Sequence, residues 1–132
     1  MMEKASQTAL PPTPQARAFK TAWFARAARK AHLADAELCT AIRQVMAGQA
    51  DDLGGGVYKK RMGKNLYRSI IVAMGGLYWV YEYLFAEQDR ANIEDEELIK
   101  FRKLANAYAA LTNQQVEGLV LGDKRMEICN DN

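Results

Sequence analysis

Five cationic side chains follow three consecutive glycines in the segment DDLGGGVYKKRMGKNLYRS, residues 51–69. Glycine beside lysine and arginine is a common setting for bound phosphate. A nucleotide-binding P-loop would need Gly-x4-Gly-Lys-Ser/Thr between a strand and a helix. Here Gly56 and Gly63 enclose six residues, and Lys64 is followed by Asn65 rather than by a hydroxyl side chain. The spacing excludes a P-loop, and the three glycines are expected to form a flexible connection.

The cations themselves are expected to converge on one face of a β-sheet. Side chains alternate along a strand, so Lys59 and Arg61 share a face and Lys60 points to the other. A turn at MGKN would bring Arg68, an exposed residue of the next strand, near this pair. Cations on one face repel one another, and an anionic ligand would relieve the repulsion. The alternative is a solvated strand edge whose lysines discourage aggregation.

Aromatic residues accompany the cations on a third segment. Trp79, Tyr81, Tyr83 and Phe85 have the same parity, and most stripes of this kind belong to a core. The end of the stripe, Tyr83 and Phe85, is the better place for stacking nucleic-acid bases.

The elements that must position these side chains follow from sequence periodicity. Segments 57–61, 66–74 and 77–86 are rich in β-branched and aromatic residues, which favours strands. The short turns between them predict an antiparallel meander, completed by a strand at 16–21. The tail KRMEICNDN adds a short strand or frays.

Apolar residues recur at helical spacing both before and after the meander. One helix is expected at 21–31 and a second from Asp35 to a stop at Gly48. A third helix is expected to be capped by Asn92, and a fourth to start at the Thr-x-x-Gln capping box of 112–115. The predicted fold class is α+β: two N-terminal helices, an antiparallel β-meander and C-terminal helices.

The composition limits the class of protein. We expect a flexible segment at 1–15 and one domain at 16–132. No apolar run is long enough for a membrane span and no export signal is recognised, so a cytoplasmic protein without membrane contact is expected. In that setting Cys39 and Cys129 are expected to be reduced thiols. With a single histidine and no carboxylate cluster near the cations, neither a metal nor another cofactor is expected.

The charge is unevenly distributed. Residues 17–68 carry eleven Lys/Arg against four Asp/Glu, whereas residues 69–132 carry six against eleven. The first part therefore has a net charge of +7 and the second −5. This asymmetry fits either a basic face that binds a polyanion or dispersed surface charge.

Four motifs in order give the chain a family resemblance. Residues 17–128 resemble a RelE-type toxin of bacterial toxin–antitoxin modules. The motifs are WFARAARK (23–30), DLGGGVYKKR (52–61), YRSII (67–71) and FAEQDRANIEDEEL (85–98). The resemblance implies a small curled antiparallel sheet with two N-terminal helices on one side. It also implies a ribosome-dependent endoribonuclease that cuts translated mRNA, with a cognate antitoxin as protein partner.

The resemblance also implies site residues. Lys59, Arg61, Arg68 and Arg90 match family positions and are the candidate catalytic residues. Candidate RNA-binding residues are Lys60, Lys64, Tyr83 and Phe85. The chain departs from the family pattern at Glu87, where relatives carry lysine, and in its short turn at 62–65. The glutamate removes a cation near the expected site, or it points away and pairs with a neighbour such as Arg90.

The residues permit a metal-independent mechanism in which the 2′-hydroxyl of RNA attacks the adjacent phosphate. Crowding by cations is expected to lower the pKa of Lys59, which would then act as general base. Arg68 and Arg90 would hold the phosphate, and Arg61 would stabilise the developing charge. Two other functions remain open. One is a ParE-type toxin that inhibits a protein such as DNA gyrase; the other is a toxin fold whose activity has lapsed.

Overall fold

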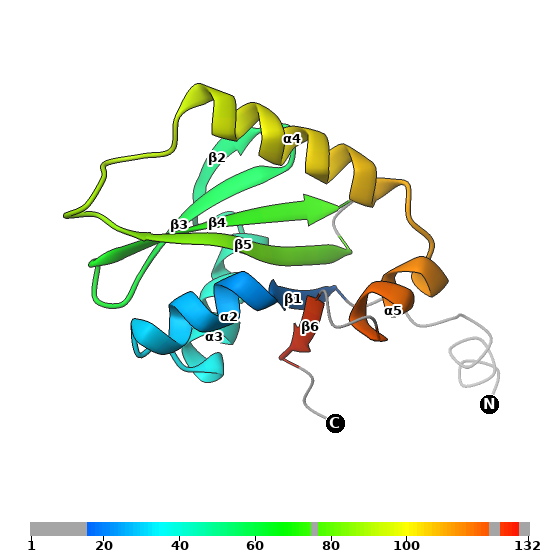
Figure 1. The fold of residues 1–132 in the computed structure, drawn as a ribbon, viewed down its shortest axis with the longest axis horizontal. Helices are drawn as coiled ribbons and strands as arrows, with labels where there is room; N and C mark the ends of the chain where they lie inside the picture. The colour runs from blue at the N-terminus through cyan, green and yellow to red at the C-terminus, as the bar shows by residue number, and fades with distance from the viewer. Residues whose placement is uncertain (1–15, 75–76, 122–124, 130–132) are drawn as a thin grey trace, which may run out of the picture.

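A six-stranded sheet organises the protein (Figure 1). The structure, a computed structural model, describes residues 16–74, 77–121 and 125–129, and the expected flexible segment 1–15 lies outside them. The strands are β1 (Arg17–Thr21), β2 (Asp51–Gly54), β3 (Val57–Met62), β4 (Tyr67–Met74), β5 (Tyr78–Ala86) and β6 (Arg125–Ile128). The helices are α2 (Ala22–Lys30), α3 (Asp35–Met46), α4 (Asp95–Ala109) and α5 (Asn113–Leu121). The α+β prediction is confirmed.

The strand order is β2-β3-β4-β5-β1-β6. The expected meander of β3, β4 and β5 is antiparallel throughout. The expected strand at 16–21 also joins the sheet, but β1 pairs with β5 in parallel. Helices and three strands separate β1 from β5, so no hairpin turn constrains their relative direction. The tail forms β6, which pairs antiparallel with β1.

A strand that the sequence did not reveal, β2, pairs antiparallel with β3. The glycines between them form a turn, in which Gly54, Gly55 and Gly56 all have positive φ. The Gly56 carbonyl accepts a hydrogen bond of 2.7 Å from the Ala73 amide on β4. The expectation of a flexible connection is therefore wrong, because this turn is fixed to the sheet.

Helices cover both faces of the sheet (Figure 1). Helices α2 and α3 lie on one face, here called the α2–α3 face, and α4 and α5 lie on the opposite, α4 face. Residues buried on the α2–α3 face include Phe24, Leu38, Ile42, Ile71 and Tyr81. Residues buried on the α4 face include Phe19, Val72, Val80, Tyr108 and Val116. In the described part of the chain, no helix is long and apolar enough to cross a membrane.

The start of α4 differs from the prediction. Its N-cap is Glu94 rather than Asn92, because Glu94 and Glu97 form a reciprocal capping box. The Asn92 side chain instead accepts a hydrogen bond from the next amide in the chain. At α5 the expected capping box is confirmed: the Thr112 amide donates to Gln115 and the Gln115 amide donates back to the Thr112 hydroxyl.

A disulfide joins Cys39 of α3 to Cys129, the residue after β6. Their Cα atoms are 5.4 Å apart. The expectation of reduced thiols is wrong, because the pairing of β6 with β1 brings the end of the chain beside α3, a contact that the sequence pattern did not indicate.

Candidate functional site

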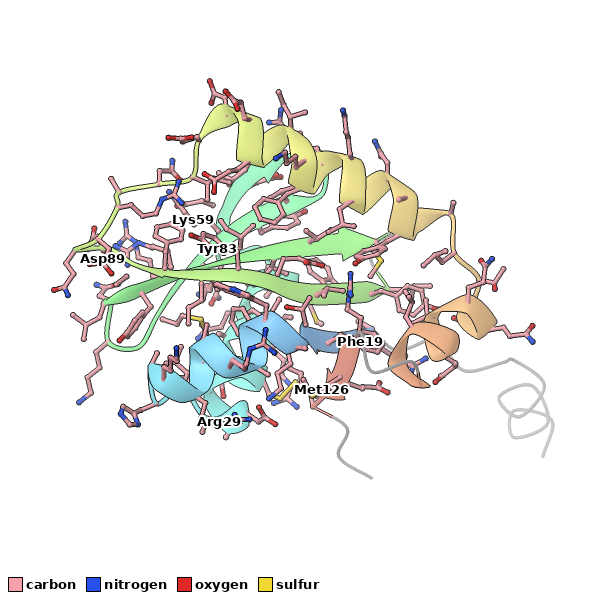
Figure 2. The ribbon with its side chains drawn as sticks, in the orientation of Figure 1. Phe19, Arg29, Lys59, Tyr83, Asp89 and Met126 are labelled. Atoms are coloured by element: carbon pink, nitrogen blue, oxygen red, sulfur yellow. A yellow bond between two sulfur atoms is a disulfide. The ribbon has the colours of Figure 1, made fainter. Side chains whose placement is uncertain are left out.

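Three of the candidate cations lie on the α4 face of the sheet, beyond the N-terminus of α4. Arg61 on β3 is directly opposite Arg68 on β4, and Arg68 is opposite Phe85 on β5. The neighbouring row contains Lys59, Ile70 and Tyr83 (Figure 2). The prediction that Lys59, Arg61 and Arg68 share one face is confirmed, and the register makes Arg61 and Arg68 direct cross-strand neighbours.

The expectation that Arg68 is exposed is wrong. Only 6 % of the residue is exposed. Its guanidinium donates hydrogen bonds to the carbonyls of Asn65 (2.9 Å) and Tyr67 (3.1 Å), at the β3–β4 turn. Arg68 is buried because its side chain folds back along this short turn, so it holds the turn as well as carrying charge.

Glu87 is the ion-pair partner of Arg68, at 2.9 Å between Nη2 and Oε2. The alternative in which Glu87 pairs with Arg90 is therefore not the arrangement in the structure. This carboxylate contacts Nη2 of Arg68, and a phosphate that binds the same nitrogen would have to compete with Glu87 for it.

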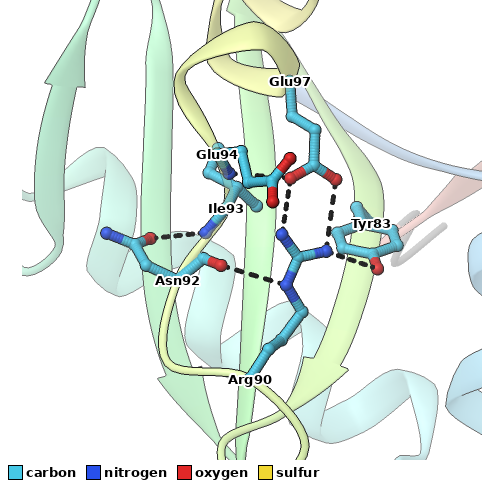
Figure 3. Close-up of polar contacts among 6 residues, drawn as sticks. All are labelled: Tyr83, Arg90, Asn92, Ile93, Glu94 and Glu97. Atoms are coloured by element: carbon cyan, nitrogen blue, oxygen red, sulfur yellow. Dashed lines mark hydrogen bonds and ion pairs between the residues drawn. The ribbon is translucent and has the colours of Figure 1, made fainter.

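Arg90 is held at the start of α4 (Figure 3). Its guanidinium makes two hydrogen bonds with the Glu97 carboxylate and a third, of 3.2 Å, with the Tyr83 hydroxyl. Its Nε donates to the Asn92 carbonyl at 3.0 Å. The bond from Arg90, helped by the Glu94 amide, lowers the pKa of Glu97, and Glu97 in turn raises the pKa of Arg90. Arg90 is thus oriented before any ligand arrives.

Lys59 also has a carboxylate neighbour. Asp51 on β2 is its cross-strand partner, with 4.0 Å between Nζ and Oδ2. Three single carboxylates, Asp51, Glu87 and Glu97, each contact one of the cations. Arg61 differs from the other three cations because its side chain contacts no carboxylate. It is exposed and makes no hydrogen bond or ion pair with the described residues. These carboxylates stay dispersed, and within the described ranges no group of three potential ligands could hold a metal ion.

A bulge in β5 divides the aromatic stripe between the two faces. Ile70 pairs with Tyr83 and Ile71 with Tyr81, so Glu82 is the extra residue. Tyr81 is consequently buried on the α2–α3 face with Trp79, whereas Tyr83 and Phe85 lie on the α4 face. The expectation that all four share one face is wrong. The two chosen for base stacking are nevertheless those that accompany the cations.

The remaining candidate residues, Lys60 and Lys64, do not join this group. Lys60 points to the other face, as expected, and donates a hydrogen bond of 2.9 Å to the Gln49 carbonyl. Lys64 is exposed at the tip of the β3–β4 turn, where its φ is 56°. Both add positive charge around the site without contacting its centre.

Comparison with protein families identifies the family of this chain. The family model for the RelE toxin of the RelE/RelB toxin–antitoxin system matches residues 16–128. The chain belongs to the RelE toxin family. It is therefore a toxin of a toxin–antitoxin system, and a cognate antitoxin is the partner that this membership implies. Neither the curated proteins nor the solved structures contain a significant match.

Sequence reasoning missed several residues of the candidate site. Asp51 was missed because β2 was not recognised, and Glu97 because its contact with Arg90 depends on the path of the loop before α4. Trp23 was missed as well: its indole stacks on Tyr83, with 5.1 Å between ring centroids. Its signal was a tryptophan in α2 that does not belong to the buried residues of the helix, which are Phe24, Ala25 and Ala28.

Proposed function

We propose that this toxin is a metal-independent endoribonuclease that cuts mRNA during translation. The observation that supports this most directly is the cross-strand pair Arg61 and Arg68, with Lys59 on the same face and Phe85 beside them. A phosphate flanked by two unpaired bases fits such a surface, because guanidinium groups bind phosphate oxygens and aromatic rings stack on bases. Dependence on the ribosome and preference for translated mRNA are proposed from family membership.

The reaction requires no external nucleophile. Lys59, the proposed general base, accepts the proton of the 2′-hydroxyl, and the 2′-oxygen forms a bond to the adjacent phosphorus. The bond from phosphorus to the 5′-oxygen then breaks, and water supplies the proton to the leaving oxygen. The products are a 2′,3′-cyclic phosphate and a 5′-hydroxyl. Arg61 stabilises the negative charge that develops on the phosphate.

Arg68 and Arg90 bind the substrate phosphate in this scheme. In the free toxin each of them is already in an ion pair with a glutamate. Glu87 and Glu97 occupy their guanidinium groups in the free toxin. Substrate phosphate must therefore displace a carboxylate or share the guanidinium with it. Arg61 has no such competitor among the described residues and is the first contact available to RNA.

The test is cleavage of a defined mRNA by the purified toxin, with and without translating ribosomes, followed by mapping of the new ends. Lys59→Met and Arg61→Ala should lower the cleavage rate by at least about 100-fold, the usual scale for a general base or charge stabiliser. Arg29→Ala, an exposed change on α2, should cleave like the unmodified toxin. Growth arrest with intact mRNA and impaired DNA supercoiling would instead support a ParE-type protein target.

A further inference from the structure

A groove runs between α2 and the edge of β5, outside the cation cluster on the sheet. Its volume is about 480 Å³. The groove exists because β1 pairs with β5 only as far as Tyr81, which leaves the edge of the last β5 residues without a strand beside it. Residues 83–86 form one wall, α2 forms the other, and Arg90 lies where the groove meets the proposed catalytic face.

The groove is predominantly cationic. Arg26 and Lys30 lie four residues apart on α2, so their side chains are neighbours on one side of the helix. Neither makes a hydrogen bond or ion pair with the described residues. Arg90 adds a third cation, and Asp89 is the acidic residue that lines the groove. The two α2 cations thus lie about one helical turn apart, and no carboxylate of the described residues is bound to either.

The groove also offers an aromatic platform. Trp23 is 44 % exposed although its ring packs on Tyr83, with 28° between the two planes. A large, exposed indole held against a second ring is a rigid surface on which an unpaired base can stack. Tyr83 connects this platform to the catalytic face, because the Arg90 guanidinium donates to its hydroxyl.

We infer that this groove binds the single-stranded RNA that flanks the scissile phosphate, with one base on Trp23 and backbone phosphates at Arg26 and Lys30. The inference rests on the proposed function and extends it to a second, non-catalytic part of the substrate. RNA fits better than an acidic peptide strand on the β5 edge, because a peptide would pair with the strand backbone and would not need an exposed indole.

The test is binding of a fluorescently labelled single-stranded 2′-O-methyl RNA to the full chain, measured by anisotropy at low salt. This probe lacks the attacking hydroxyl, so affinity is measured without cleavage. Arg26→Glu and Lys30→Glu should each weaken binding by about tenfold, with a shallower salt dependence. The control Arg29→Glu makes the same charge change on an exposed part of α2 that does not line the groove, and it should stay within about twofold.

Trp23 provides a second, uncharged test. Trp23→Ala should weaken binding by about tenfold, and Trp23→Phe should recover most of the loss because it keeps an aromatic face. No RNA binding by the unmodified toxin, or equal weakening by Arg26→Glu and Arg29→Glu, would overturn the inference. Unchanged RNA affinity together with lost antitoxin binding would assign the groove to a peptide.

The same measurements separate this inference from the proposed function. Weaker RNA binding by the groove variants, in a toxin that cuts no mRNA under any condition, would support the groove and refute the ribonuclease. Normal mRNA cleavage and normal RNA affinity in every groove variant would support the ribonuclease and refute the groove.

Discussion

At the scale of single residues, three of the four candidate catalytic cations already contact a carboxylate. Asp51, Glu87 and Glu97 neutralise charges that a substrate phosphate would otherwise meet. The contacts differ in strength, because the Lys59 pair is long and solvated whereas Arg68 is almost fully buried. A pair at the surface contributes about 0–1 kcal/mol, so RNA can replace the Lys59–Asp51 pair at little cost.

Arg68 should matter for stability as well as for activity. Arg68→Ala removes two hydrogen bonds to turn carbonyls and an ion pair, and should lower the free energy of unfolding by about 1–3 kcal/mol. Urea denaturation measures this, with Arg61→Ala as the exposed control, for which a change within about 0.5 kcal/mol is expected. Equal stability of the two variants would mean that Arg68 does not hold the turn.

The Glu87 carboxylate should compete with substrate phosphate for the guanidinium of Arg68. Glu87→Gln removes the charge that occupies Arg68 and should strengthen RNA binding by about fivefold at low salt, which corresponds to about 1 kcal/mol. The gain should shrink as added salt screens the interaction. Glu96→Gln, an exposed change of the same charge in α4, is the control. Identical RNA affinities for unmodified toxin and Glu87→Gln would place Glu87 outside the binding surface.

At the scale of elements, the turns and the bulge decide which side chains meet. The glycine turn between β2 and β3 brings Asp51 opposite Lys59, and the bulge at Glu82 turns Tyr83 and Phe85 toward the cations. Without the bulge, alternation along β5 would put these two rings on the α2–α3 face with Tyr81.

The glycine turn should tolerate substitution poorly. At Gly56 φ is +86°, and an added Cβ would lie 2.9 Å from the Ala73 carbonyl oxygen. Gly56→Ala should therefore lower the free energy of unfolding by about 1–3 kcal/mol, through strain and the clash together. In the matched change Gly118→Ala, at an exposed position of α5, the added Cβ meets open space, and stability should rise by up to about 1 kcal/mol. Thermal or urea unfolding compares the two variants directly.

The bulge residue Glu82 should make stability depend on pH. Burial raises the pKa of its carboxyl to about 7, although Arg125 lowers it in part. The folded state therefore favours the protonated form. The resulting stabilisation is complete below the unfolded pKa near 4.5 and is lost as the pH rises through about 7, by about 3 kcal/mol in all. Urea unfolding at pH 5 and pH 8 should show this fall, and Glu82→Gln should remove most of it. An equal fall in the free energy of unfolding between pH 5 and pH 8 in the unmodified toxin and in Glu82→Gln would assign the pH dependence to another titratable group.

Local sequence patterns were sufficient to predict most of the fold and the shared face of the cations in the candidate site, but not the carboxylate partners of those cations. Alternation and short turns predicted β3, β4 and β5, and with them the shared face of Lys59 and Arg61. Local patterns could not predict β2, since a four-residue strand ending in glycine has no recognisable signal. The bulge could not be predicted either, because one extra residue moves the following side chains to the opposite face of the sheet without changing the composition of the strand. The carboxylate partners depend on these two features and on the path of the loop before α4, so they required the structure.

At the scale of the whole molecule, the two ends of the described chain meet at one edge of the sheet. β6 pairs with β1, and the disulfide fastens the residue after β6 to α3. The Arg17 guanidinium adds an ion pair with Glu127 across the same two strands, at 2.8 Å. This edge lies far from the cation cluster in strand order, with β5 and β4 between β1 and Arg61.

The disulfide should contribute strongly to stability. It closes a loop between residues 90 positions apart, and in the chain-entropy model a loop of that size is worth about 4–5 kcal/mol. Cys129→Ala should lower the urea midpoint under oxidising conditions, and a reducing agent should lower the midpoint of the unmodified toxin similarly. Adding the reductant to Cys129→Ala should have no further effect. An unmodified toxin insensitive to reductant would show that the bridge is absent in solution.

The position of β6 also bears on how the toxin is made. Ala18 pairs with Ile128, a contact between nearly the first and nearly the last described residues, so this edge has a high contact order. Strand β1 has no partner on its outer side until the last strand has left the ribosome. The meander and its cations precede β6 in synthesis, and domains fold as units while the chain emerges. The sheet of this toxin is therefore complete only once β6 has left the ribosome, and a chain that still lacks β6 presents an open strand edge along β1.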